Sequence, residues 1–90
     1  MTDIYDAVIV GGGHNGMAAA GYLSRAGKKV VVVERMDKVG GMTSSGYMIP
    51  EAPGYLVTPC AVELLFARGS GIIEDLDLKK HGLTTIDPDP

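Results

Sequence analysis

Residues 6–35 read DAVIVGGGHNGMAAAGYLSRAGKKVVVVER, and this stretch decides the fold. Two runs of apolar residues without alternation, within 5–10 and 30–33, are typical of parallel strands that are covered on both faces. Small and apolar residues recur at helical spacing over about 15–26, and Gly27 follows them as a left-handed C-terminal cap. Strand, helix and strand in this order predict a βαβ unit, so the fold class is α/β, as part of a Rossmann-like, doubly wound parallel sheet.

Three glycines follow the first predicted strand in the pattern G-x-G-x-x-G, at Gly11, Gly13 and Gly16. Gly11 permits the sharp turn, Gly13 leaves room for a pyrophosphate beside the backbone, and Gly16 allows the helix to pack closely on the strand. The unpaired N–H groups at the start of the helix favour an anion there. A strand before the motif and a helix after it favour a dinucleotide-binding site over an ordinary tight turn.

Glu34 ends the second predicted strand, at the place where a dinucleotide-binding fold carries an acid. A carboxylate there can accept both ribose hydroxyls of an adenosine, and it would repel a 2′-phosphate. Arg35 leaves NADP open, because a nearby arginine can accommodate that phosphate. A solvated acid at the end of a strand is the alternative interpretation of Glu34.

NAD and FAD share these features, and a second glycine pair in ERMDKVGGMTSS, Gly40 and Gly41, separates them. With this pair, the chain resembles FAD-dependent oxidoreductases of the phytoene desaturase and carotenoid–retinoid isomerase type, in VGGGHNG, AGKKVVVVER and VGG. The later stretches APGYLVTPCAVELL and IIEDLDLKKHGL also resemble that family. The likeness therefore covers nearly the whole chain, although the sharp motifs lie in its first half.

The resemblance implies that the glycines of the first motif lie against the FAD pyrophosphate and that Glu34 holds the adenosine ribose. It implies that Gly40 and Gly41 bring their loop near the diphosphate and the ribityl chain. The related amine-oxidase pattern has an arginine directly after the glycine pair, where this chain has Met42. This difference argues against an amine oxidase and leaves a charge contact to the pyrophosphate missing or supplied elsewhere.

The predicted cofactor-binding residues are Gly11, Gly13, Gly16, Glu34, Arg35, Gly40, Gly41 and Met42. Hydroxyl groups at 43–45 fit cofactor donors and turn residues equally well. The resemblance implies an oxidoreductase that passes a hydride from an unactivated or allylic carbon of an apolar substrate to flavin, or that uses flavin for isomerisation. An NAD(P)-dependent dehydrogenase and a non-catalytic nucleotide-binding module stay open as alternatives.

Residues 1–90 are expected to be the N-terminal part of an FAD/NAD(P)-binding domain, because a doubly wound domain needs more parallel strands than this chain contains. The rest of that domain and the substrate domain would then lie elsewhere, in the same polypeptide or in another chain. No catalytic residue is predicted within these residues.

Composition narrows the class of protein further. The formal net charge of -3 gives no electrostatic reason to expect nucleic acid, and no apolar run approaches the roughly 20 residues of a membrane helix. The start MTDIYDAVIV lacks the basic segment of a signal peptide. A single cysteine, Cys60, rules out an internal disulfide and suits a reducing compartment, so we expect a cytoplasmic protein.

The remaining elements are less regular. The sequence predicts a loop with one short hairpin over 36–59, short helices over 61–68 and 72–78, and a strand that begins at 83. His14 and His81 have no partners at ligand spacing, so no metal site is predicted. Four further residues are predicted to lie in the core rather than at a reactive or substrate site: Cys60, Tyr47, Tyr55 and Phe66.

Overall fold

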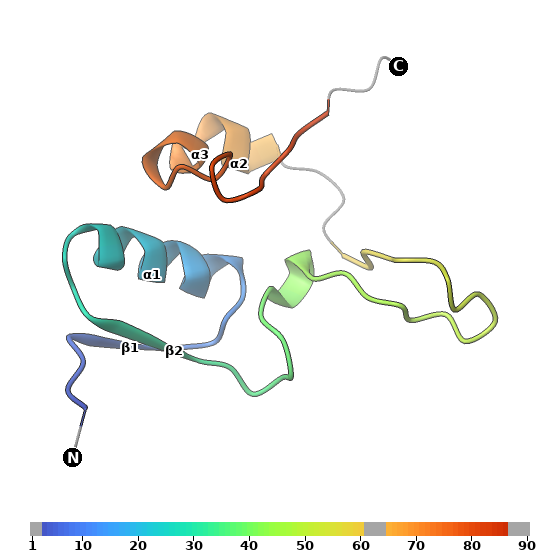
Figure 1. Ribbon diagram of the computed structural model, residues 1–90, viewed down its shortest axis with the longest axis horizontal. Helices are drawn as coiled ribbons and strands as arrows, with labels where there is room; N and C mark the ends of the chain where they lie inside the picture. The colour runs from blue at the N-terminus through green and yellow to red at the C-terminus, as the bar shows by residue number, and fades with distance from the viewer. Residues whose placement is uncertain (1–2, 61–64, 87–90) are drawn as a thin grey trace.

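The computed structural model describes residues 3–60 and 65–86. Its elements follow in the order strand, helix, strand, then three short helical segments (Figure 1). They are β1 (Ala7–Val10), α1 (His14–Arg25), β2 (Val30–Val33), the 3-10 helix η1 (Gly41–Thr43), α2 (Leu65–Gly69) and α3 (Ile72–Asp75). In the described part of the chain, no helix is long and apolar enough to cross a membrane.

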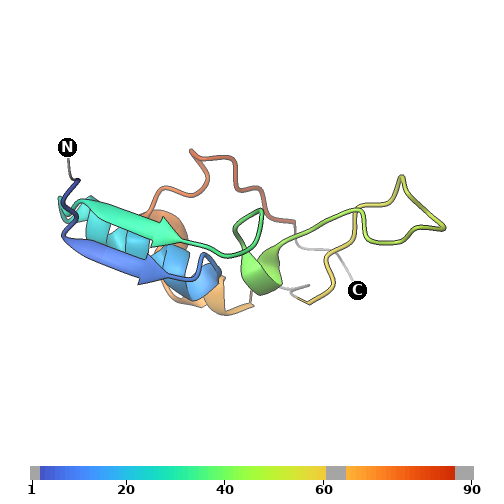
Figure 2. The same cartoon turned by 90° about the horizontal axis from the view of Figure 1, so that it is seen from below.

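The two strands lie side by side and run in the same direction, with Ala7 opposite Val30 and Val10 opposite Val33. Helix α1 connects them and covers one face of the pair (Figures 1 and 2). The predicted βαβ unit is therefore confirmed. Strand β1 is shorter than predicted, because Tyr5 and Asp6 precede the ladder, and α1 begins one residue earlier.

Helix α1 ends as its sequence predicts. Gly27 has a φ of +85°, in the left-handed region that favours glycine, and its N–H donates to the carbonyl of Ser24 at 3.0 Å. The N–H of Lys28 donates to the carbonyl of Leu23, also at 3.0 Å. These two bonds satisfy carbonyls that the end of the helix would otherwise leave free, and they turn the chain back towards β2.

The other face of the sheet is bare in the described part of the chain, so these residues supply only one of the two covered faces that the sequence predicts. Val8 and Val10 are 61% and 87% exposed, and Val33 is 51% exposed. Ile9, on the opposite face, lies against the start of α1 at Gly16. Successive side chains of a strand point to opposite faces, and one crossover helix can cover only one of them.

Helices α2 and α3 form a further layer on the side of α1 that faces away from the sheet (Figures 1 and 2). The approach is close at Gly21, where an added Cβ would lie 2.7 Å from Cδ1 of Leu76. The hydroxyl of Tyr22 donates to Oδ2 of Asp75 at 2.8 Å. Ile73 is the buried apolar residue of this region, at 7% exposure. A glycine contact and polar bonds at the surface thus hold α3 to α1.

The helices after residue 60 begin and end at other residues than the sequence predicts. The first part of the helix predicted over 61–68 falls outside the described residues, at 61–64. Helix α2 begins at Leu65 and ends at Gly69, one residue beyond the predicted end. Helix α3 ends at Asp75, short of the predicted 78, because the backbone of Asp77 takes a φ of +51° that no α-helix continues. No strand forms over 83–86, and 87–90 fall outside the described residues.

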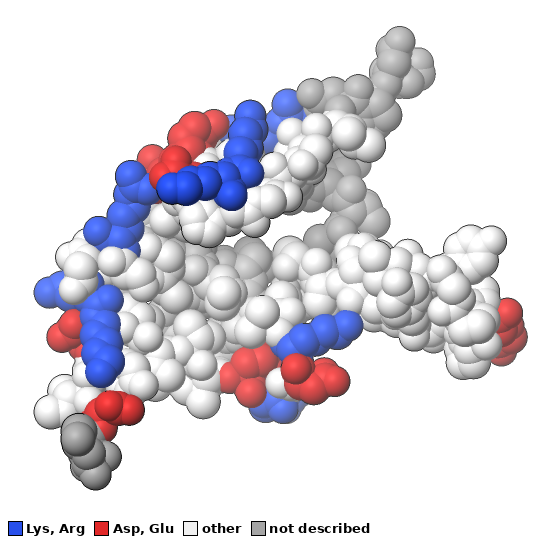
Figure 3. All heavy atoms as spheres, viewed as in Figure 1, with Lys and Arg blue, Asp and Glu red and all other residues white. Residues whose placement is uncertain are grey.

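The predicted hairpin is reduced to a single antiparallel bridge between Gly46 and Val57, whose two N–H···O bonds measure 2.9 and 2.8 Å. The loop that this bridge closes extends away from the βαβ unit, and its surface is mostly uncharged (Figures 1 and 3). Tyr47 and Tyr55 are each 70% exposed there, and Cys60 is exposed as well, so the prediction of core positions is wrong for all three. The side chain of Phe66 falls outside the described residues.

The apolar character of Tyr47, Tyr55 and Cys60 shows that their side chains favour burial. It does not show which segment would cover them, and no described segment does.

Candidate cofactor site

The first glycine loop turns the chain from β1 into α1. Gly11 has a φ of +103°, and its N–H still donates to the carbonyl of Val33 at 2.8 Å, so the turn begins directly where the strand pairing ends. A Cβ on Gly16 would lie 2.0 Å from the carbonyl oxygen of Gly11 and 3.2 Å from Cγ2 of Ile9. One glycine is thus required by backbone conformation and the other by the close approach of α1 to the turn.

Gly13 differs from both, because the protein itself leaves space beside it. It caps the N-terminus of α1 with ordinary extended dihedral angles, φ -76° and ψ -174°. A Cβ on Gly13 would meet only Cα of Gly41 within 4 Å, at 3.9 Å. No side chain caps this helix end, so N–H groups of the first turn have no side-chain partner there. An anion could approach the backbone here.

The second glycine loop lies directly against the first. Gly40 donates its N–H to the carbonyl of Gly12 at 2.7 Å, and Gly13 and Gly40 form a parallel bridge. Gly40 and Gly41 both have positive φ, at 121° and 55°. A Cβ on Gly41 would lie 3.1 Å from Cα of Gly13. The structure therefore brings together the two glycine groups that the sequence predicts to be one site.

Glu34 joins the end of β2 to the first loop. Its Oε1 accepts the N–H of Gly12 at 2.7 Å, and its Oε2 accepts the N–H of Met36 at 2.8 Å. These two bonds, first that from Met36 and then that from Gly12, lower the pKa of Glu34 below its ordinary value of 4.5. The carboxylate is therefore ionised at neutral pH and lies beside the glycine turn.

The ionisation of Glu34 gives a pH prediction. Because the pKa is lower in the folded protein than in the unfolded chain, these bonds stabilise the fold fully above pH 4.5, and the stabilisation is lost as the pH falls through the folded-state pKa. In full-length protein labelled with ¹³C at glutamate carboxyl carbons, the resonance that disappears in Glu34→Gln should titrate below pH 4.5. Titration at or above that value would contradict the two hydrogen bonds.

The other predicted residues of the site are placed less specifically. Arg35 is exposed, and its positive charge adds to the lowering of the pKa of Glu34. Met42 lies in η1 and is 59% exposed. The hydroxyls of Thr43 and Ser44 donate to the carbonyls of the glycine pair, at 2.6 and 2.7 Å. Because each hydroxyl has a single proton, these two residues serve the turn rather than offering a free donor.

Sequence reasoning missed Gly12. The G-x-G-x-x-G pattern treats this position as variable, yet the residue is buried and bonded on both sides of its backbone. A Cβ there would lie 3.0 Å from Cγ1 of Val39 and 3.4 Å from Cβ of Glu34. Three consecutive glycines, one more than the motif needs, are the signal that could have found it.

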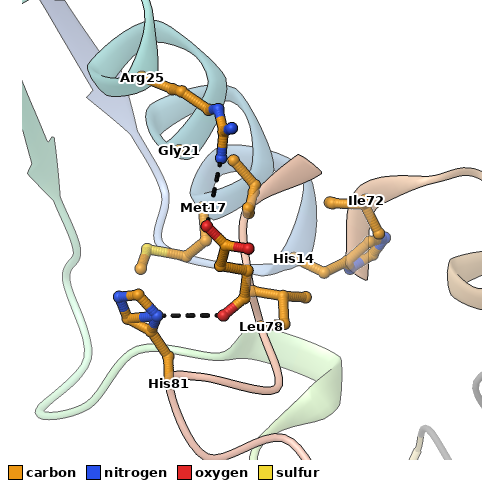
Figure 4. A pocket seen from close by; sticks show the side chains of 9 residues that line it. His14, Met17, Gly21, Arg25, Ile72, Leu78 and His81 are labelled. Atoms are coloured by element: carbon orange, nitrogen blue, oxygen red, sulfur yellow. Dashed lines mark hydrogen bonds and ion pairs between the residues drawn. The ribbon is translucent and has the colours of Figure 1, made fainter. Parts of the chain in front are cut away.

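A cavity lies between α1 and the stretch that runs from α3 to His81 (Figure 4). It encloses about 540 Å³ and is lined mainly by apolar side chains such as Met17, Ile72 and Leu78, with His14 and His81 among its walls. The described residues contain no group of three or more His, Cys, Asp or Glu side chains that could hold a metal ion. His81 is exposed and lies beyond the end of α3 at Asp75.

The known proteins that this chain resembles include several oxidoreductases. The family model described as FAD dependent oxidoreductase matches residues 6–76. Pyridine nucleotide-disulfide oxidoreductase domain-containing protein 2 of Mus musculus is 43% identical over 79 residues, which are 88% of this chain and 13% of that protein.

Two dehydrogenases are also similar. A limonene dehydrogenase subunit of Castellaniella defragrans is 36% identical over 84 residues, 93% of this chain and 15% of its own. Phytoene dehydrogenase of Streptomyces griseus is 42% identical over 76 residues, 79% of this chain and 15% of its own. This chain thus spans only 13 to 15% of the length of these relatives.

These matches confirm the resemblance that the glycine motifs indicated, and the residues matched by the family model include the βαβ unit and both glycine loops. The chain belongs to the FAD-dependent oxidoreductase family.

Proposed function

We propose that this chain supplies the adenosine and pyrophosphate part of the FAD site in a flavin-dependent oxidoreductase. The contact between the two glycine loops carries the proposal, because it forms one backbone cradle at the positive end of α1. The family match supports FAD, rather than NAD(P), as the dinucleotide. Bound flavin would accept a hydride from the substrate, while these residues bind and orient the cofactor.

The roles of individual residues follow from their positions. Gly11, Gly13 and Gly16 would lie along the pyrophosphate, with Gly13 leaving the space that it occupies. Glu34 would accept the ribose hydroxyls with the lone pairs that its two backbone bonds leave free. The remaining proposed contacts belong to the second loop and its neighbours: Arg35, Gly40, Gly41 and Met42.

We further propose that residues 1–90 are the N-terminal part of the cofactor domain. The bare sheet face supports this, because in a doubly wound domain further strands would extend the sheet at its edges and a helix would cover this face. The substrate is proposed to be a small apolar molecule, by analogy with relatives named for limonene and phytoene. The remainder of the enzyme would follow in the same polypeptide or bind as another chain, and we propose that it works in the cytoplasm.

The cofactor is tested by titrating full-length apo-protein with FAD, NAD and NADP in a calorimeter. We expect tight binding of FAD, and we expect Glu34→Ala to weaken it roughly tenfold to a hundredfold, the range for hydrogen bonds to a charged group. Binding should not vanish, because the glycines that would lie along the pyrophosphate are all still present. Glu51→Ala, an exposed acid in the protruding loop, is the matched control and should bind FAD like wild type.

Two results would count against this function. Tight binding of NAD or NADP without any binding of FAD would overturn the flavoenzyme proposal. An unchanged FAD affinity in Glu34→Ala would remove Glu34 from the site.

A further inference from the structure

The backbone of Gly12 is held from both sides by different parts of the chain. Its N–H donates to Oε1 of Glu34 at 2.7 Å, and its carbonyl accepts the N–H of Gly40 at 2.7 Å. Glu34 lies at the end of β2, and Gly40 lies in the second glycine loop. One buried residue therefore ties the end of the sheet to both loops of the cradle.

The carboxylate of Glu34 also sets the path of the chain towards the second loop. Its other oxygen accepts the N–H of Met36 at 2.8 Å, directly where the chain leaves the strand. The chain then returns at Gly40 to form the parallel bridge with Gly13. Both oxygens of one side chain thus take part in bringing the two loops to the same place.

The fit between the loops leaves little room for other residues. A Cβ on Gly12 would lie 3.0 Å from Cγ1 of Val39, closer than ordinary van der Waals contact. A Cβ on Gly41 would lie 3.1 Å from Cα of Gly13. Because one contact involves a side chain and the other involves backbone, only the first can be relieved by shortening a neighbour.

We propose that Glu34 is a positioning residue of the cradle, whose carboxylate clasps the N–H groups of Gly12 and Met36 and so holds the two glycine loops together through contacts within the protein. This role rests on the proposed function and adds to the proposed ribose contact. It lowers the cost of binding, because loops that are already ordered lose less conformational entropy when the pyrophosphate arrives.

The clasp and the ribose contact make different demands on the ligand. If Glu34 binds only ribose hydroxyls, its removal should not affect a ligand that lacks them. If Glu34 positions the loops, its removal should weaken every ligand that presents a pyrophosphate to them. A comparison of ADP with 2′,3′-dideoxy-ADP, which keeps the pyrophosphate and loses both hydroxyls, separates the two roles.

The experiment uses full-length protein from which FAD has been removed, as wild type, Glu34→Ala, Glu34→Gln and the control Glu51→Ala. Amide hydrogen exchange is measured over residues 11–16 and 36–41, and ADP and 2′,3′-dideoxy-ADP are titrated. In Glu34→Ala we expect exchange of both loops to rise roughly tenfold and the affinity for 2′,3′-dideoxy-ADP to fall by a similar factor. Glu34→Gln keeps one acceptor oxygen, so its loop exchange and its affinity should lie between those of wild type and Glu34→Ala. It replaces Glu34→Ala in the comparison if the alanine variant does not fold.

A second set of variants tests the clasp without touching Glu34. Gly12→Ala should raise exchange in both loops, and adding Val39→Ala should reverse much of that rise by removing the crowded methyl group. Gly54→Ala, where an added Cβ meets nothing within 4 Å, should leave both loops unchanged.

The outcomes distinguish this inference from the proposed function. Unchanged loop exchange in Glu34→Ala, with weakened ADP but unaffected 2′,3′-dideoxy-ADP, would overturn the clasp and leave the FAD site in place. A wild-type protein that binds no FAD would overturn the proposed function, while exchange in the FAD-free protein would still decide the clasp.

Discussion

Replacing Gly13 with valine is expected to abolish FAD binding by the full-length protein and to leave its fold intact. Gly13 has extended dihedral angles that valine adopts readily, and beyond its chain neighbours an added Cβ would meet only Cα of Gly41 within 4 Å, at 3.9 Å. The branched carbons of valine would instead fill the space beside the helix N-terminus that we assign to the pyrophosphate. Gly13→Val should therefore lose FAD affinity while the stability of its fold stays unchanged.

This expectation is checked by measuring flavin absorption and thermal unfolding of purified Gly13→Val after reconstitution with FAD. Gly54→Val is the matched control, because an added Cβ at Gly54 meets nothing within 4 Å and the loop is remote from the cradle. Equal flavin content in Gly13→Val and wild type would show that the phosphate site has been misplaced.

Gly16, three residues further on, is expected to behave in the opposite way. A Cβ in Gly16→Ala would lie 2.0 Å from the carbonyl oxygen of Gly11, so α1 must move away from the turn. We expect the free energy of unfolding to fall by about 3 kcal/mol or more, at the upper end of overpacking effects, because the crowded atom is backbone and cannot change rotamer.

Urea denaturation of FAD-free protein measures this effect without any contribution from cofactor binding. Gly69→Ala, for which an added Cβ meets no atom within 4 Å, provides the comparison. An alanine variant at Gly16 that matches wild type in stability would mean that α1 does not approach the turn as closely as the structure shows.

The βαβ unit could be predicted from the sequence because its signals are local and agree with one another. Two unbroken apolar runs, a helical spacing between them and Gly27 at the helix end each point to the same arrangement. The meeting of Glu34 with the glycine turn was also predictable, since neighbouring parallel strands end at the same edge of a sheet.

Other features depend on contacts between distant residues, which no local pattern reports. Gly12 is needed because Val39 and Glu34 come to lie beside it, and neither is near it in the sequence. Tyr47 and Tyr55 are aromatic residues of a kind common in protein cores, yet no described segment covers their side chains. Helix α3 ends earlier than predicted because Asp77 has a positive φ, which the local sequence does not indicate.

The uncovered valines of the sheet bear on when the cofactor can be loaded during the life of the polypeptide. The strands, α1 and both loops come from one contiguous stretch, so they can assemble locally. In the larger cofactor domain proposed above, the stabilisation from burying Val8, Val10 and Val33 would be gained only when the rest of that domain covers them. Until then the paired strands also offer open edges on which another chain could add. We therefore expect flavin capture to be a late event of biogenesis. For the enzyme proposed above, we then expect damage to the segments that would cover this face to give a colourless, self-associating protein rather than a slower enzyme.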